Sequence, residues 1–136
     1  METQRDEIKE ENVEMDKIEI GEDKPQIESK KVVIVDYRIE PITKEKKEIG
    51  KKLILLVDHP DMVEKTIEIS GVKYQQGEKI KQSGLWVNLD KDKKIPYKSA
   101  VATMLRHFKC SQIINLKGVE AETALDDGGY LLIKAY

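Results

Sequence analysis

The sequence predicts a mostly β domain with one main α-helix, folded as a small antiparallel β-barrel behind an acidic leader. Three observations lead to this fold class: an uneven division of charge, many short β-branched segments separated by turn residues, and one stretch with helical periodicity. Residues 1–30 carry 11 acidic and 5 basic side chains, whereas residues 31–136 carry 15 and 19. The absence of alternating strand and helix patterns argues against a parallel α/β fold.

We expect the acidic leader, residues 1–30, to be disordered and the barrel domain to occupy residues 31–136. The few apolar side chains of the leader are scattered among charges, and Pro25 interrupts any helix. Because the leader is acidic and the body is mildly basic, we hypothesise that the leader folds back over the basic side chains when no ligand is bound.

Four segments before the helix have strand character, and they are residues 32–39, 53–57, 66–74 and 80–89. The first segment is expected to end before Pro41, and the lysine-rich stretch 43–47 to form the tip of a hairpin. Residues 58–61 have the composition of a turn. Gly71 is expected to be a bulge in the third segment, and Gly84 a bend in the fourth.

One helix is expected from Ser99, a good N-cap residue, to Phe108, because its apolar residues form a single stripe. A short turn is expected at residues 111–116. Two strands, 119–125 and 130–136, then flank the Asp-Asp-Gly-Gly sequence at 126–129, which is typical of a tight hairpin turn.

This order of elements fits an OB-like barrel, which has five strands and a helix between the third and the fourth. Because four segments precede the helix here, one of them must be an extra strand or an irregular arm. The count is least certain at residues 71–78.

The residues offer no constellation for catalysis, and we expect no enzyme activity, no catalytic residues, no cofactor and no metal. His107 and Cys110 have a spacing that can bind zinc, but the chain has one further histidine and no further cysteine. The single cysteine excludes an intrachain disulfide, no apolar run is long enough for a membrane span, and the N-terminus lacks signal-peptide character. We therefore expect a cytoplasmic location.

Clustered lysines together with aromatic residues favour binding of single-stranded nucleic acid, because lysines neutralise phosphates and flat rings stack bases. The candidates for phosphate contact are Lys46, Lys47, Lys52, Lys79, Lys81, Lys93 and Lys94. The candidates for base stacking are Tyr37, Tyr74 and Trp86, with Tyr97 as a further aromatic beside a lysine cluster. Two other interpretations remain open: the lysines solvate ordinary loops, and Trp86, between Leu85 and Val87, belongs to the core.

Residues 83–89, the capped helix 99–108 and residues 116–122 together resemble small OB-fold-type single-stranded-DNA-binding proteins of phages and mobile elements. The resemblance implies sequence-tolerant, non-catalytic binding to single strands in replication or recombination. Such proteins often carry an acidic C-terminal tail, whereas the acidic segment of this chain is N-terminal. Its Leu116–Val119 motif is also one residue shorter than the family pattern.

The alternative function is a protein–protein interaction or structural module, such as a viral structural component or an adaptor, without nucleic-acid binding. A strand such as residues 66–70 can add to the sheet of a partner or of a second copy. The position of the aromatic residues discriminates between the two functions, since an adaptor would keep them in the core and a nucleic-acid-binding protein on a basic face.

Overall fold

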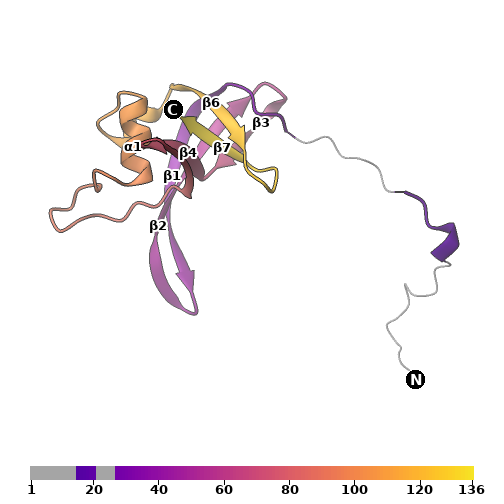
Figure 1. The fold of residues 1–136 in the computed structure, drawn as a ribbon, viewed down its shortest axis with the longest axis horizontal. Helices are drawn as coiled ribbons and strands as arrows, with labels where there is room; N and C mark the ends of the chain where they lie inside the picture. Colours follow the sequence, from indigo (N-terminus) through magenta and orange to yellow (C-terminus); the bar gives the residue numbers. More distant parts are fainter. Residues whose placement is uncertain (1–14, 21–26) are drawn as a thin grey trace.

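The computed structural model describes residues 15–20 and 27–136, and within them the chain is mostly β with one α-helix (Figure 1). The strands are β1 (Val32–Lys44), β2 (Lys47–His59), β3 (Met62–Ile69), β4 (Gly71–Gln76), β5 (Lys79–Gly84), β6 (Glu120–Leu125) and β7 (Leu131–Ala135). The helix is α1 (Ala100–His107), and two 3₁₀ turns are η2 (Met15–Lys17) and η3 (Ile113–Leu116).

The strands form one seven-stranded sheet in the order β3-β2-β1-β6-β7-β4-β5. All neighbouring strands that pair are antiparallel except β4 and β7, which are parallel. The predicted closed barrel is not formed, because the two edge strands of this order, β3 and β5, do not pair with each other. Instead, the segment after β5 is hydrogen-bonded to Ser70 and to β2. Leu85 N donates to Ser70 O, Leu53 N donates to Leu85 O, and Val87 N donates to Lys51 O.

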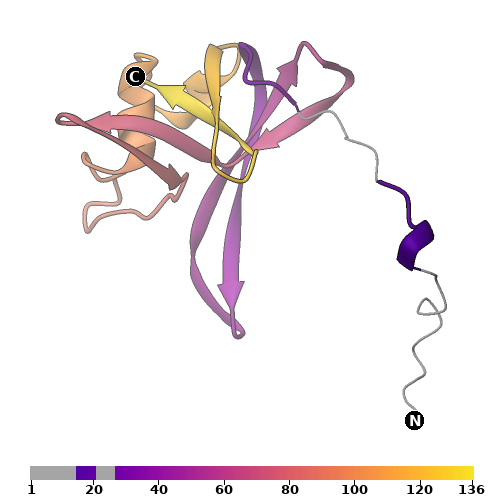
Figure 2. The same ribbon diagram turned by 45° about the vertical axis from the view of Figure 1, so that its right-hand side comes forward.

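The β1–β2 hairpin is longer than predicted and extends from the body as an arm (Figures 1 and 2). The expectation that β1 ends before Pro41 is wrong, because Pro41 pairs with Lys51 inside the ladder. The Lys51 carbonyl faces Val87 on the opposite side of β2, so the Pro41–Lys51 pair is a non-hydrogen-bonded one. The proline nitrogen then points to the open edge of β1, where a missing N–H costs nothing.

The tip of the arm is a two-residue turn, in which Glu45 has φ of 53° and Lys46 has φ of 67°. Two successive residues with positive φ are typical of a type I′ turn, the geometry that fits the twist of a hairpin. Neither residue is glycine or asparagine, which explains why the sequence gives no strong turn signal there.

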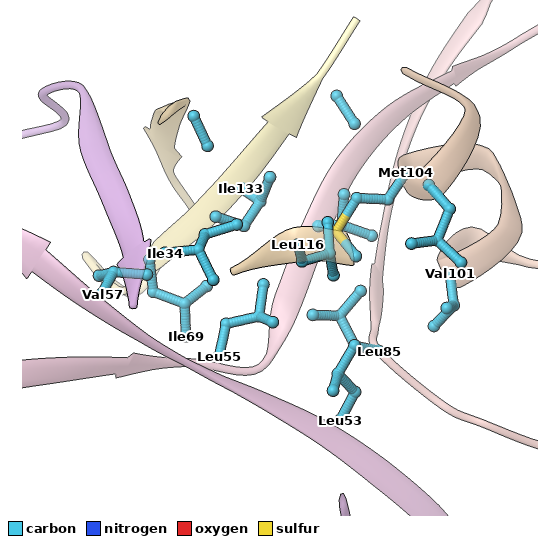
Figure 3. Packing of buried hydrophobic residues seen from close by; sticks show 14 of the residues in the cluster. Ile34, Leu53, Leu55, Val57, Ile69, Leu85, Val101, Met104, Leu116 and Ile133 are labelled. Carbon is cyan, nitrogen blue, oxygen red and sulfur yellow. The ribbon is translucent and has the colours of Figure 1, made fainter. Parts of the chain in front are cut away.

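The core is aliphatic and lies between the sheet and α1, with side chains from most elements meeting in one cluster (Figure 3). Its fully buried members include Ile34 of β1, Leu53 and Leu55 of β2, Met104 of α1 and Ile133 of β7. Leu85 is also fully buried, which fixes the segment that follows β5 against β2. Since each such side chain contributes about 1.5–3 kcal/mol through burial, this cluster is the main stabilising contact of the domain.

The third predicted segment is divided into β3 and β4 at Ser70, and Gly71 permits the close approach of β4 to β7. A Cβ placed on Gly71 would lie 2.6 Å from Leu132 Cδ2. The chain changes partner at this point, since β3 pairs with β2 whereas β4 pairs with β7 and β5. Gly71 is therefore not a bulge within one strand, as predicted, but the point where the chain crosses from one half of the sheet to the other. The fourth predicted segment is also shorter, because β5 ends at Gly84.

The predicted helix is confirmed, and Ser99 caps it with its hydroxyl oxygen 3.1 Å from Ala102 N. Its apolar stripe packs against β4 and β7. The following 3₁₀ turn begins with Gln112 as the capping residue rather than with Ser111. The hairpin of β6 and β7 turns where the Asp-Asp-Gly-Gly sequence predicts.

The end of the leader is fastened to the body as a strap, residues 27–30. Glu28 O accepts a hydrogen bond from Nε2 of the buried His59 at 2.7 Å, and Lys30 O accepts one from Thr123 Oγ1 at 2.6 Å. Lys30 Nζ lies 2.9 Å from Asp61, a contact that raises the pKa of Lys30. The expectation of disorder concerns mainly residues 1–14 and 21–26, which lie outside the described residues.

Replacing His59 by alanine is expected to lower the free energy of unfolding by about 2–4 kcal/mol. The side chain is fully buried, its Nε2 donates to Glu28 O, and its Nδ1 accepts from Asp61 N at 3.0 Å. Loss of the ring removes both bonds and leaves a cavity. The measurement is urea unfolding followed by circular dichroism.

The matched control is His107→Ala, which replaces the other histidine of the chain at an exposed position on α1. We expect it to change stability by no more than about 0.5 kcal/mol. Equal effects of the two substitutions would contradict the role of His59 in fastening the strap.

Candidate nucleic-acid interface

Trp86 lies along the outer face of the sheet over two glycines. A Cβ placed on Gly50 would lie 3.1 Å from Trp86 Cε3, and one on Gly84 would lie 3.1 Å from Trp86 Nε1. The two ends of the indole therefore border positions that carry no side chain, one glycine in β2 and one in β5, and the end of the Lys52 side chain lies over Gly84 as well. The ring is half-buried and is absent from the core cluster, whereas its neighbours Leu85 and Val87 pack into that cluster.

Lys52 places a positive charge over one face of this ring. It forms an isolated bridge with Trp86 across the strands, and its Nζ lies 5.2 Å from the ring centroid. Cross-strand neighbours share a face of the sheet, so the two side chains present a cation and a π surface together. In proteins that bind single-stranded nucleic acid, aromatic rings stack bases and neighbouring cations neutralise phosphates.

A groove of ≈ 710 Å³ begins at Lys52 and runs between β3, β5 and the turn that joins β6 to β7. Ser83 and Gln82 of β5 supply hydroxyl and amide groups to it, and the 74% exposed Tyr130 lies at its other side. Because Lys52 belongs to both the groove and the Trp86 contact, the ring and the groove form one continuous surface. We call Trp86, Lys52 and this groove the platform.

Two carboxylates line the groove, and each already has donors. Glu68 lies 2.9 Å from Arg38 Nη2, while Arg38 also pairs with Glu40. Glu40 and Glu68 together raise the pKa of the Arg38 guanidinium. The Asp126 carboxylate accepts the backbone N–H groups of Gly128 and Tyr130, each at 2.9 Å. Their charges are therefore partly compensated, and they oppose a phosphate chain less than free carboxylates would.

The structure distributes the predicted lysines over four places. Lys52 is on the platform, Lys46 and Lys47 are at the tip of the arm, and Lys79 and Lys81 are on β5. Lys93 and Lys94 lie in the loop before α1, whose turn is closed by Asp90. Within residues 15–20 and 27–136, none of the seven lysines forms an ion pair with a carboxylate. By contrast, Arg38, Lys117 and Lys134 each pair with a carboxylate, which a phosphate would have to displace.

The two predicted tyrosines are not on the platform. Tyr74 is 8% exposed and belongs to the core cluster, so its ring offers no face to a base. Tyr37 packs partly against the core, and Lys117 Nζ lies 5.6 Å from its ring while also pairing with Asp36. The N–H of Tyr37 donates to the Asp36 carboxylate and, with Lys117, lowers the pKa of Asp36. Of the three residues predicted to stack bases, Trp86 alone belongs to the platform.

The potential metal ligands and the one cysteine of the described residues lie in separate places. No set of three or more histidine, cysteine or carboxylate side chains there is placed to hold a metal ion. Partial burial raises the pKa of the Cys110 thiol, so it is less readily ionised. His59 and His107 lie apart, one buried in the strap contact and one exposed on α1. Among the described residues, no helix has the length and apolar character needed to cross a membrane.

Comparisons with protein-family models, with curated proteins and with solved structures give no match for this chain.

Sequence reasoning missed Tyr130, which lines the same groove as Lys52. The sequence predicts Tyr130 to be the first residue of a strand, but β7 begins at Leu131 and Tyr130 lies in the turn. The available signal was the Asp-Asp-Gly-Gly sequence, since a residue directly after a tight turn is exposed at a loop tip.

Gly50→Ala is expected to displace the Trp86 ring, because the new methyl group would lie 3.1–3.2 Å from two ring carbons. Trp86 is the only tryptophan of the chain, so its fluorescence reports this site alone. We expect emission at longer wavelength, stronger quenching by acrylamide and a stability loss of about 1–3 kcal/mol.

Gly128→Ala is the matched control, since its Cβ would meet other atoms only at 3.4 Å or more. This substitution should leave the tryptophan emission unchanged. Unchanged emission in Gly50→Ala as well would contradict the close packing of the indole on Gly50.

Proposed function

We propose that this protein binds single-stranded nucleic acid without sequence preference and without catalysis. The observation that supports it most is the indole of Trp86, laid over Gly50 and Gly84 beside Lys52 at the start of the groove. A flat ring backed by glycines and flanked by a cation suits any base, because every base has a π-face and every nucleotide a phosphate. Single-stranded DNA is the expected ligand, and replication or recombination in a phage or mobile element the expected context.

The topology supports an OB-like assignment as part of this proposal. If β3 and β4 are counted as one strand interrupted at Ser70 and β5 is set apart, five strands remain, with α1 between the third and the fourth. Their pairing then runs β1–β2, β2–β3, β4–β7, β7–β6 and β6–β1. In this interpretation β5 is the additional strand, and it leads directly to Trp86. OB folds bind oligonucleotides on an exposed sheet face and its adjoining loops, and in the proposed assignment Trp86 and Lys52 would occupy such a face.

The lysines of the arm and of β5 extend the proposed contact beyond the platform. Lys46 lies six residues from Lys52 along β2 and its turn, a span of about 20 Å in an extended strand. Such a spacing suits backbone contacts spread along several nucleotides, so the lysines supply affinity while Trp86 supplies stacking.

The alternative, a module that pairs with another protein through a free strand, has β3 as its best surface. This strand pairs with β2 alone, and Val63 on it is 87% exposed. However, Glu64 and Lys65 follow directly, and charged side chains on an edge strand discourage pairing with another sheet. We therefore favour nucleic acid, and the failure of oligonucleotide binding would favour this edge.

The protein is expected to bind a labelled dT oligonucleotide of about 30 nucleotides with micromolar or tighter affinity at low salt. Measured by fluorescence anisotropy, the affinity should fall steeply as salt rises. The double variant Lys46→Gln/Lys47→Gln should lower the slope of log K against log salt by about 1.4, or about 0.7 for each lost phosphate contact.

The control variant, Lys65→Gln/Lys109→Gln, removes the same charge from exposed positions that line neither the platform nor the arm. It should leave the slope near that of the wild type. No binding of wild type at low salt would refute the proposed function.

Trp86→Ala is expected to weaken binding of the same oligonucleotide by about 5- to 100-fold, since stacking on an aromatic ring contributes about 1–3 kcal/mol per base. The salt slope should stay unchanged, because no charge is lost. Trp86→Phe, which keeps a smaller ring on the two glycines, should retain part of the affinity. Equal binding by wild type and Trp86→Ala would remove Trp86 from the interface.

A further inference from the structure

A second pocket, of ≈ 520 Å³, lies between the β4–β5 turn and the start of α1. It is separate from the platform, and no residue lines both. Gln75, Gln76 and Gly77 come from the turn, and Tyr97, Lys98, Thr103 and Arg106 come from the loop and the helix.

Arg106 and Tyr97 form a fixed pair in this pocket. The guanidinium carbon lies 3.9 Å from the centroid of the Tyr97 ring, and Nη1 donates to Tyr97 O at 2.8 Å. Nη2 donates to Thr103 Oγ1 at 3.3 Å, and that hydroxyl in turn donates to Ser99 O at 2.9 Å. The guanidinium is therefore held in position before any ligand arrives, which lowers the entropy lost on binding.

The tyrosine ring keeps a free face. Arg106 covers one side of it, while the residue as a whole is 72% exposed. An aromatic ring held from behind by a cation and open in front is a stacking surface for a base.

The lining of the pocket contains two cations and no carboxylate. Neither Lys98 nor Arg106 forms an ion pair with an acidic side chain in the part of the chain that the structure describes. Beyond the hydrogen bonds already given, Arg106 retains further N–H donors. An anion can therefore enter without displacing an existing partner, and a phosphate accepts the remaining donors with good geometry.

The two glutamines provide groups suited to a base edge. Gln75 uses its amide nitrogen to donate to Gly77 O at 3.2 Å, and Gln76 uses its amide oxygen to accept from Lys81 at 2.7 Å. The amide oxygen of Gln75 and the amide nitrogen of Gln76 take part in neither bond, so the two residues that line the pocket retain one acceptor group and one donor group. Such a pair suits different bases alike.

We propose that this pocket is a nucleotide subsite, in which a base stacks on the free face of Tyr97 and its phosphate is held by Arg106 and Lys98. The inference rests on the proposed function and adds a second point of contact for the same strand. β5 connects the two sites, since it begins beside the β4–β5 turn and ends at Gly84 under Trp86. A six-residue strand spans about 20 Å, so a single strand following β5 reaches both the pocket and the platform.

The test measures binding of the dT oligonucleotide to Arg106→Gln, Tyr97→Leu and Lys109→Gln at several salt concentrations. Arg106→Gln should weaken binding about tenfold and reduce the salt slope by about 0.7, because it removes one phosphate contact. Tyr97→Leu should weaken binding about tenfold with the slope unchanged, because it removes one stacked base. Lys109→Gln removes a charge near the end of the same helix but outside the pocket, and should behave as wild type.

A site-resolved measurement separates ligand contact from a structural role. In a heteronuclear NMR titration of the wild-type protein with the oligonucleotide, the backbone amides of Gly77 and Thr103 should shift. If Trp86→Ala weakens binding while Arg106→Gln and Tyr97→Leu match Lys109→Gln and these amides stay unshifted, the subsite is refuted and the proposed function stands. If wild type does not bind the oligonucleotide at low salt, both are refuted.

Discussion

The arrangement of the whole sheet depends on the close approach of β4 to β7 at Gly71. A Cβ at position 71 would lie 2.6 Å from Leu132 Cδ2, so any residue other than glycine there requires the Leu132 side chain to move. The passage from β3 to β4 lets one continuous stretch of chain pair with β2 on one side of Ser70 and with β7 on the other. The core cluster lies behind that junction and joins both halves of the sheet.

The platform follows from the same junction. Once β4 is placed beside β7, its antiparallel partner β5 runs back toward Ser70, and the next residues meet β2. Leu85 then enters the core, and alternation along an extended chain turns Trp86 to the outer face. Buried Leu85 and exposed-face Trp86 are therefore two results of one packing constraint. The glycines at positions 50 and 84 complete it by leaving room for the indole.

Elements with a local cause could be predicted from the sequence. The stripe of apolar residues and the Ser99 cap specify α1 by themselves, and the Asp-Asp-Gly-Gly sequence specifies the last hairpin. Features that depend on a distant partner could not be predicted. Pro41 can continue β1 because the backbone carbonyl of Lys51 points away from it, toward Val87. Tyr74 is buried because α1 packs on β4.

The residues of the candidate site could likewise be chosen from the sequence, but their contacts could not. The lysines could be chosen from their clustering alone, but their four separate locations depend on topology. Lys52 was part of that cluster, yet its contact with Trp86 requires the register of the segment after β5 against β2. Tyr97 was recognisable as an aromatic beside a lysine cluster, whereas its contact with Arg106 depends on how the loop folds back onto α1. Contacts between side chains that are distant along the chain, such as Lys52 with Trp86, could therefore not be predicted from the sequence.

The strap has a consequence for how any anion competes at this surface. Ile27 lines the groove and Glu28 is fastened by His59, so the leader joins the body at the rim of the platform. The leader as a whole carries six more acidic than basic residues. A tethered segment acts at an effective concentration that is commonly millimolar, independent of the amount of protein in solution. Under the proposed function, a strand of nucleic acid would compete with this tethered acidic segment, and displacing the segment would reduce the apparent binding free energy.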